Sequence, residues 1–489
     1  MRHMLPNNHN NVDLDQVAHQ VMLDHGFIPD FSPPVLNELD HIKEAPAPLP
    51  SYKDLRHLLW ISIDNIDSKD LDQLTYAEPM QNGKTHRLYV AVADVSGTVQ
   101  KESLIDLQAQ NNTTSIYTPT VIFPMLHPKL STDITSLNPQ VDRNAVVVEM
   151  EIDEAGKFEL LDVYLANVHN HQKLAYPTVS EWLEHGKPLQ SVSPEVHEQL
   201  KLQDLISNKI QQFREQLGTL NFDTIEVKPI LENHIPVALS KVISDRGHTL
   251  IENCMIAANS CLSKYLISQN IPILKRIVKK PQRWEKIVEI AKIHDVSLPL
   301  EPNAKALQNF LLQQQKQDPL RFPDLSLTII KLIGRGEYVP SYPGNEAPGH
   351  FDLALEDYAH TTAPNRRYPD LIMQRLLKSF LQKQNPSYSD AELQTLAQHC
   401  TKKEEDANKV ERHLKKSAAA MILKNQIGQI YSAIVTGASS KGTWVRLLDP
   451  PVEGKLVSGF KHLDVGDTIE VELLQVDVAQ GYIDFGRHH

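Results

Sequence analysis

Four aspartates follow directly on an apolar, strand-like segment near the start of the chain. Residues 60–63 read Trp-Ile-Ser-Ile, and Asp64, Asp67, Asp70 and Asp72 come after them with a single lysine in between. Carboxylates this close repel one another and shift each other's pKa unless a cation lies between them. Hard divalent ions, Mg²⁺ above all, prefer oxygen ligands of this kind. The cluster therefore indicates a metal site at the end of a buried strand.

A calcium loop and an ordinary acidic turn are the alternatives for this cluster. A calcium loop of the EF-hand type needs glycine at its sixth position and glutamate at its twelfth. Counting from Asp64, Asp67 or Asp70, that pattern fails. An acidic turn stays open, although the strand leading straight into Asp64 favours a functional group, because strand ends are where rigid folds present catalytic residues.

A second group of residues with binding chemistry lies late in the chain. Arg366 and Arg367 come just before Pro369, and proline suits the first position of a helix. Backbone N–H groups, the helix dipole and guanidinium groups all favour a bound phosphate at such a place. The alternative is that the two arginines pair with Asp370 or Glu356.

A third candidate is an aromatic residue close to the C-terminus. In the strand-like segment 443–448, alternation places Trp444 and Arg446 on one face. An aromatic ring beside an arginine on the outside of a small barrel forms a platform for stacking bases and contacting phosphates. Packing of Trp444 against a neighbouring domain is the alternative.

Periodicity predicts the elements that hold these residues. Helices are expected at residues 13–25, 251–265, from 369 onward and over 391–425, with a Pro-rich linker at 45–50. Strands are expected at 88–95 and, as a hairpin, at 145–152 and 158–166. The last sixty residues contain five short strand patterns, at 430–436, 443–448, 454–457, 468–476 and 482–485. Five such strands suggest a barrel of the OB type.

Composition limits the class of protein. The 489 residues carry a net charge of −12 and form more than one domain, without an apolar run long enough to span a membrane. The start lacks the apolar segment of a secretory signal, so a cytoplasmic protein is expected. The negative charge argues against non-specific binding of nucleic acid over the whole surface but not in a local basic channel. Cys254, Cys261 and Cys400 have no metal-ligand spacing and are expected to be buried thiols.

Several segments together resemble the ribonuclease II/RNase R (RNB) family. They are residues 64–73, 92–96, 124–126, 350–355 and 363–371, in that family's order, and residues 437–449, 453–457 and 465–467 are similar to its S1 domain. The resemblance implies an α+β fold, in which an RNB catalytic domain with a mixed sheet and packed helices precedes a five-stranded S1 barrel. The domains expected are a helical N-terminal segment at 1–50, the catalytic domain at 51–385, its helical extension at 386–425 and the S1 domain at 426–489. The N-terminal segment is too short for the cold-shock domains usual in the family.

The resemblance also implies an activity and its residues. A Mg²⁺-dependent enzyme that hydrolyses single-stranded RNA from 3′ to 5′ into 5′-mononucleotides is expected, with one or two ions and with Mn²⁺ as a substitute. Family carboxylates fall on Asp64, Asp70 and Asp72, and the phosphate-contacting arginine on Arg366. Tyr117 matches a tyrosine that packs on a base. A monomer without an obligate protein partner is the family's default.

One departure from the family pattern concerns the metal. A fourth aspartate usually follows the position of Asp72, and here it is Gln73. An amide oxygen can bind Mg²⁺ but carries no charge, and Asp67 is a candidate to compensate. Gln73 and the net negative charge leave open a catalytically weak RNA-binding relative, and the short N-terminal segment leaves open a phosphodiesterase limited to short oligonucleotides. Asn365 and Ala363 also differ from the residues usual beside the arginine pair.

Overall fold

The N-terminal segment is helical. The computed structural model describes residues 12–81, 83–242, 245–345, 347–439 and 442–488. Helix α1 (Leu14–Asp24) is capped by Asp13, whose carboxylate accepts hydrogen bonds from the first N–H groups of the helix. Helix α2 (Pro33–His41) follows, and the Pro-rich passage after it is largely exposed. The expected helix at 13–25 is confirmed.

A six-stranded mixed sheet forms the core of the large domain. Its order is β1-β8-β2-β3-β4-β7, and β7 also pairs with β8. The strands are β1 (Lys53–Asp54), β2 (Trp60–Asp64), β3 (Gln73–Pro79), β4 (His86–Ala93), β7 (Asp142–Ile152) and β8 (Phe158–Ala175). Strands β2 and β4 are buried on both faces, which explains their continuous apolar sequences. The predicted strand at 88–95 and the hairpin of β7 and β8 are confirmed.

Helices cover this sheet and complete the α+β fold that the sequence predicts. Between β4 and β7 lie α3 (Leu104–Asn112), the short strands β5 (Ile116–Tyr117) and β6 (Ile122–Phe123), and the short π-helix η2 (Lys129–Ile134). After β8 come α4 (Tyr176–His185), α5 (Pro194–Leu217) and α6 (Arg246–Ser268). Thr75 on β3 donates to Gln203 on α5, and most of α6 is buried, so α5 and α6 pack close to the sheet.

Seven elements in the middle of the chain lie outside the predicted pattern. Helices α7 (Trp284–Ile293), α8 (Ala304–Gln317) and α9 (Phe322–Ile333) share a small core, which also contains Leu220 and Val278. Strands β9 (Glu226–Glu232) and β10 (Ile235–Val242) form an exposed hairpin, and β11 (Ile273–Val278) pairs with β12 (Gly336–Ser341).

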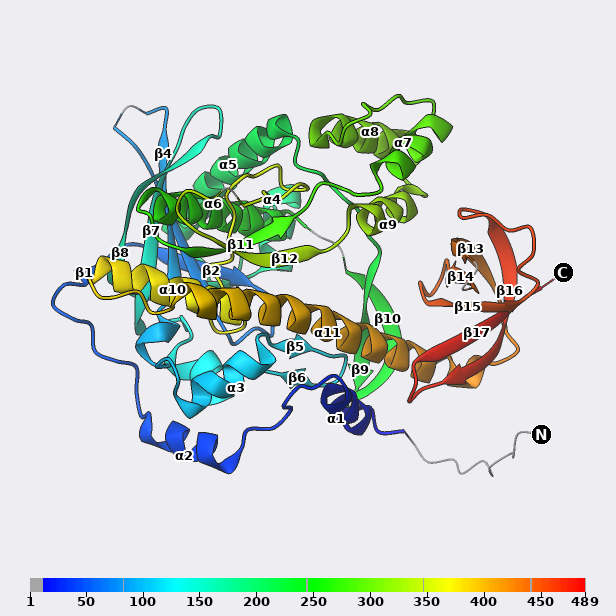
Figure 1. Cartoon of the computed structure of the whole chain (residues 1–489), viewed down its shortest axis with the longest axis horizontal. Helices are drawn as coiled ribbons and strands as arrows, with labels where there is room; N and C mark the ends of the chain where they lie inside the picture. Colours follow the sequence, from blue (N-terminus) through cyan, green and yellow to red (C-terminus); the bar gives the residue numbers. More distant parts are fainter. Residues whose placement is uncertain (1–11, 82, 243–244, 346, 440–441, 489) are drawn as a thin grey trace.

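Two helices lead from the sheet to the C-terminal barrel. Helix α10 (Tyr368–Leu381) starts with Pro369 in its first turn, and α11 (Asp390–Leu423) is 34 residues long. Figure 1 shows α11 crossing the molecule to the barrel. The barrel closes in the order β13-β14-β15-β17-β16. Its strands are β13 (Ile430–Ser439), β14 (Gly442–Leu447), β15 (Glu453–Ser458), β16 (Thr468–Asp477) and β17 (Tyr482–Arg487), so all five predicted strands are confirmed.

Two smaller expectations concern the cysteines and the membrane. Cys254, Cys261 and Cys400 are buried free thiols, as predicted. In the described part of the chain, no helix is both long enough and apolar enough to cross a membrane.

Candidate active site

The loop between β2 and β3 carries the acidic cluster and is held on both sides. Leu71 is buried, and its N–H donates to Ser136 Oγ over 3.0 Å while its carbonyl accepts from the N–H of Leu137. The carbonyl of Asp72 accepts from the N–H of Ala93 at the end of β4. These contacts fix Asp70 and Asp72 on either side of an apolar anchor.

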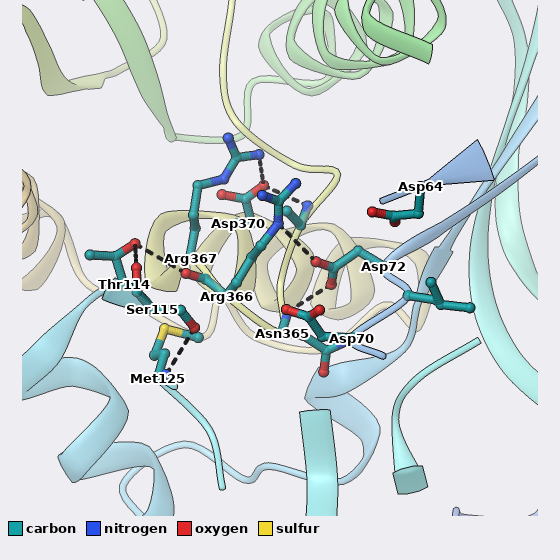
Figure 2. Close-up of polar contacts among 12 residues, drawn as sticks. Asp64, Asp70, Asp72, Thr114, Ser115, Met125, Asn365, Arg366, Arg367 and Asp370 are labelled. Carbon is teal, nitrogen blue, oxygen red and sulfur yellow. Dashed lines mark hydrogen bonds and ion pairs between the residues drawn. The ribbon is translucent and has the colours of Figure 1, made fainter. Parts of the chain in front are cut away.

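Asp72 is the most buried carboxylate of the cluster. Its Oδ1 accepts a 2.9 Å hydrogen bond from the backbone N–H of Asn365, and its Oδ2 lies 3.3 Å from Nε of Arg366 (Figure 2). Burial raises the pKa of Asp72 to about 7, although the charge of Arg366 opposes the rise. A carboxylate in this position is stabilised by additional positive charge.

Asp70 and Tyr117 form the neighbouring part of the site. The hydroxyl of Tyr117 donates to Asp70 Oδ2 over 3.2 Å, and its backbone N–H donates to Glu411 on α11. Burial raises the pKa of Asp70, with a further rise from the nearby charge of Asp64. Figure 2 shows Asp64, Asp70 and Asp72 grouped beside Arg366, so the structure brings the predicted carboxylates and the predicted arginine together.

The two arginines before α10 have different partners. Arg366 lies beside Asp72 with 43% of its side chain exposed, so its guanidinium can also reach a ligand. Arg367 donates to Asp370 Oδ1 over 2.7 Å, and Asp370 is fully buried. The alternative that these arginines pair within the chain is therefore correct for Arg367. Its contact with RNA stays a prediction.

The carbonyl of Arg366 ties this loop to the strand that carries Tyr117. It accepts hydrogen bonds from the N–H of Ser115 and the hydroxyl of Thr114 (Figure 2). The N–H of Met125 in turn donates to Ser115 Oγ. Arg366 and Tyr117 are therefore positioned by one hydrogen-bonded unit.

The side chains near Asp72 offer the oxygen donors that a hard divalent ion prefers, but those that the structure describes do not already surround a metal position. Within the described residues, no three His, Cys, Asp or Glu side chains already form a metal-binding set. The side-chain oxygen of Gln73 is buried without a hydrogen-bond partner in the described structure, which leaves it free to act as a ligand. Together with Asp64, Asp70 and Asp72 it supplies an all-oxygen donor set, as Mg²⁺ requires. Asp67 is exposed in the loop.

The barrel residues behave differently from the prediction. Arg446 is largely buried and pairs with Asp324 of α9 at 3.0 Å, so it joins two parts of the chain instead of facing solvent beside Trp444. Lys455, which is exposed, pairs across the strands with Trp444. The half-buried Trp444 ring lies against Gly437 and Gly442, where a Cβ would come within 3.4 Å of it. Trp444 and Lys455 are therefore neighbours across the strands, and a contact of Trp444 with RNA stays a prediction.

Two contributors to the site had no signal in the sequence. Asn365 acts through its backbone N–H, which no residue type reveals. Thr135 donates to Asn365 Oδ1 over 2.5 Å and so holds the Asn365 side chain, although it lies 230 positions away. Only the folded chain brings these groups to Asp72.

Comparison with known proteins identifies the class. Residues 52–383 match the RNB domain family, and residues 429–488 match the RNase II-type exonuclease C-terminal S1 domain. The chain belongs to the RNB family, as its sequence motifs predict.

Curated relatives with similar sequences carry the name Ribonuclease R. The protein of Vibrio cholerae is 30% identical over 475 residues, which cover 88% of this chain and 56% of the relative. That of Escherichia coli K12 is 29% identical over 486 residues, which cover 88% and 57%. This chain thus spans little more than half the length of these relatives.

Solved structures share the fold. Mycoplasma genitalium RNase R in complex with ribose methylated single-stranded RNA has a TM-score of 0.89 at 24% identity, over 98% of this chain and 79% of that one. A yeast pseudonuclease, Ssd1, has a TM-score of 0.72 at 16% identity, over 95% and 58%. These two likenesses show that the chain shares its fold with both proteins.

Proposed function

We propose that this protein is a 3′-to-5′ exoribonuclease that hydrolyses single-stranded RNA to 5′-mononucleotides. The proposal depends on the closeness of Asp70 and Asp72 to Arg366, which lies almost 300 positions later in the sequence. The names of the curated relatives and the RNA in the Mycoplasma genitalium complex support RNA as the substrate.

The residues have distinct parts in this reaction. Asp64, Asp70, Asp72 and Gln73 would hold Mg²⁺, in one or two ions, with Mn²⁺ as a substitute. The bound metal would activate water and stabilise the leaving oxygen. Arg366 offsets negative charge on the phosphate as the transition state forms. The ring of Tyr117, 39% of which is exposed, stacks on a base near the 3′ end.

Bond changes in the hydrolysis are simple. The water oxygen forms a bond to phosphorus, and the bond from phosphorus to the 3′ oxygen of the preceding nucleotide breaks in line. The proton lost by the water leaves the site, and the 3′ oxygen takes up a proton. The products are a 5′-mononucleotide and an RNA shorter by one residue with a free 3′-hydroxyl.

A catalytically weak RNA-binding protein is the second candidate, favoured by one observation. Gln73 stands where the family pattern has an aspartate, and it removes one negative charge from the donor set. Incubation of 5′-labelled single-stranded RNA with Mg²⁺ distinguishes the candidates. A ladder of shortened products supports the exoribonuclease, and retained binding without cleavage supports the second candidate. Cleavage restricted to dinucleotides indicates a phosphodiesterase for short oligonucleotides.

A further inference from the structure

Residues 65–69, which we call the connecting loop, join the first of the candidate metal ligands to the others. The first three residues of this loop are exposed, and Ile66 is 71% exposed. A backbone hydrogen bond closes the turn, from the N–H of Ser68 to the carbonyl of Asn65 over 3.2 Å. Burial of apolar side chains therefore does little to fix the connecting loop, and its course depends on hydrogen bonds from neighbouring elements.

Lys173 on strand β8 contacts the connecting loop. Its ammonium group donates to the carbonyl of Ser68 and lies 3.5 Å from the carbonyl of Ile66. Strand β8 runs parallel to β2 here, with Lys173 opposite Ser62, and the lysine is half-buried. The side chain thus holds the two carbonyls on either side of Asp67.

The partners of Lys173 are backbone groups. Among the residues that the structure describes, no carboxylate lies within 4.0 Å of its ammonium group. A lysine has three N–H donors and no acceptor, so an ammonium group between two carbonyls fixes the path of the backbone. Lys173 therefore acts on the shape of the connecting loop.

The same strand supports the other end of the carboxylate cluster. Asn170 of β8 donates to Ser62 Oγ over 3.0 Å and to the carbonyl of Leu137 over 2.8 Å. The N–H of Leu137 donates in turn to the carbonyl of Leu71, whose two neighbours in the sequence are carboxylates of the cluster. Strand β8 thus positions both the connecting loop and the segment that returns to β3.

The course of the connecting loop also sets the direction of the Asp64 side chain. The N–H of Asn65, the first residue of the loop, donates to Asp64 Oδ1 over 2.9 Å. Asp64 lies close enough to Asp70 for its charge to raise the pKa of Asp70. With no cation between them, these two carboxylates repel each other and push the loop outward. An ammonium group bound to the loop's carbonyls opposes that movement.

We propose that Lys173 is a positioning residue for the candidate metal site. By holding the connecting loop, it keeps Asp64 beside Asp70, so that their oxygen atoms stay within reach of one divalent ion. Ligands that are already in place lose less conformational freedom when the ion binds. The inference rests on the proposed function, because it needs a divalent ion at these carboxylates.

Binding of Mn²⁺ to the whole chain, followed by the EPR signal of free Mn²⁺, tests this role without any cleavage of RNA. Lys173→Gln and Lys173→Met remove the ammonium group, whereas Lys173→Arg keeps N–H donors for both carbonyls. Lys187→Gln is the matched control, because Lys187 is exposed and pairs with Glu181 over 2.8 Å. Circular dichroism shows whether each variant folds.

The dissociation constant for Mn²⁺ should rise about tenfold in the two neutral variants and stay within about threefold of the parent value in Lys173→Arg and Lys187→Gln. Saturating Mn²⁺ should restore kcat on single-stranded RNA in the neutral variants while KM for the RNA stays unchanged. General damage to the fold would not be reversed in this way.

Unchanged Mn²⁺ affinity in both neutral variants overturns the proposal, as does a loss in Lys173→Arg that equals the loss in Lys173→Gln. Failure of both neutral variants to fold also overturns it, because Lys173 would then support the whole domain. A parent protein that binds Mn²⁺ but cleaves no RNA contradicts the proposed function alone, and the Mn²⁺ affinities still decide the role of Lys173.

Discussion

Asn365 donates its backbone N–H to Asp72 Oδ1 over 2.9 Å, although 293 positions separate the two residues. Asp72 lies on the loop between β2 and β3, and Asn365 lies just before α10. The next residue, Arg366, approaches the other oxygen of the same carboxylate (Figure 2). The orientation of Asp72 is therefore set by the loop that also carries the phosphate-binding arginine.

Substitution with lysine distinguishes the role of Arg366 from that of Arg367. Arg366→Lys keeps the charge but loses the planar guanidinium, so kcat falls on the order of 10²-fold. Arg367→Lys keeps a cation beside Asp370 and changes kcat only a few-fold. Steady-state kinetics on a single-stranded RNA measures both. A larger loss of kcat in Arg367→Lys than in Arg366→Lys would contradict the assignment.

If Gln73 is one of the Mg²⁺ ligands, as the proposed function has it, its missing charge lowers the affinity for Mg²⁺. Gln73→Asp adds a charged ligand to the set, so the Mg²⁺ concentration for half-maximal activity decreases about tenfold or more. Gln73→Asn, which adds no charge, is the matched control. Activity measured over a Mg²⁺ titration gives the result. Equal Mg²⁺ dependence in Gln73→Asp and the parent protein would remove Gln73 from the proposed site.

Stability without divalent ions depends on Asp72. Its folded-state pKa of about 7 lies above the ordinary aspartate value of 3.8, so the folded state holds the proton more tightly than the unfolded state. The stabilisation is complete below pH 3.8 and is lost as the pH rises to about 7, with a change of about 4 kcal/mol in the free energy of unfolding.

Urea denaturation in EDTA between pH 4 and pH 8 measures this loss. In Asp72→Asn the side chain does not titrate, so the free energy of unfolding should change with pH by about 4 kcal/mol less than in the parent protein. Added Mg²⁺ should restore the stability of the parent protein at pH 8. The same pH dependence in Asp72→Asn as in the parent would show that other groups cause it.

The ion pair of Arg446 and Asp324 fixes the barrel to α9. Both side chains are largely buried, and burial raises the pKa of Asp324 while Arg446 opposes the rise. A double-mutant cycle with Arg446→Met and Asp324→Leu should give a coupling energy of about 1–2 kcal/mol in the free energy of unfolding. Additive single effects would mean that the pair contributes nothing to docking.

Local sequence patterns predicted where strands and helices lie better than they predicted which residues their side chains contact. The five barrel strands follow from alternation because their inward residues, such as Val445 and Leu447, form the barrel core. The same alternation placed Arg446 on the outer face, but it cannot show that Asp324 of α9 packs there. Helices α7–α9 were missed; their apolar faces form a core with Leu220 and Val278 that is separate from the core of the six-stranded sheet.

In the candidate active site, the sequence likewise located the residues but not all of their contacts. Family motifs located Asp64, Asp70, Asp72 and Arg366, and the structure brings them together. The hydrogen bond from Asn365 depends on which segments meet after folding.

Cleavage of a 5′-labelled single-stranded RNA in Mg²⁺, by the parent protein and by Asp72→Asn, tests the central claim most directly. The account predicts a ladder of products that shorten from the 3′ end and a release of 5′-mononucleotides by the parent protein. Asp72→Asn should lose activity on the order of 10³-fold and still bind the RNA. Equal activity of the two proteins, or no cleavage by the parent protein at any Mg²⁺ or Mn²⁺ concentration, would contradict the account.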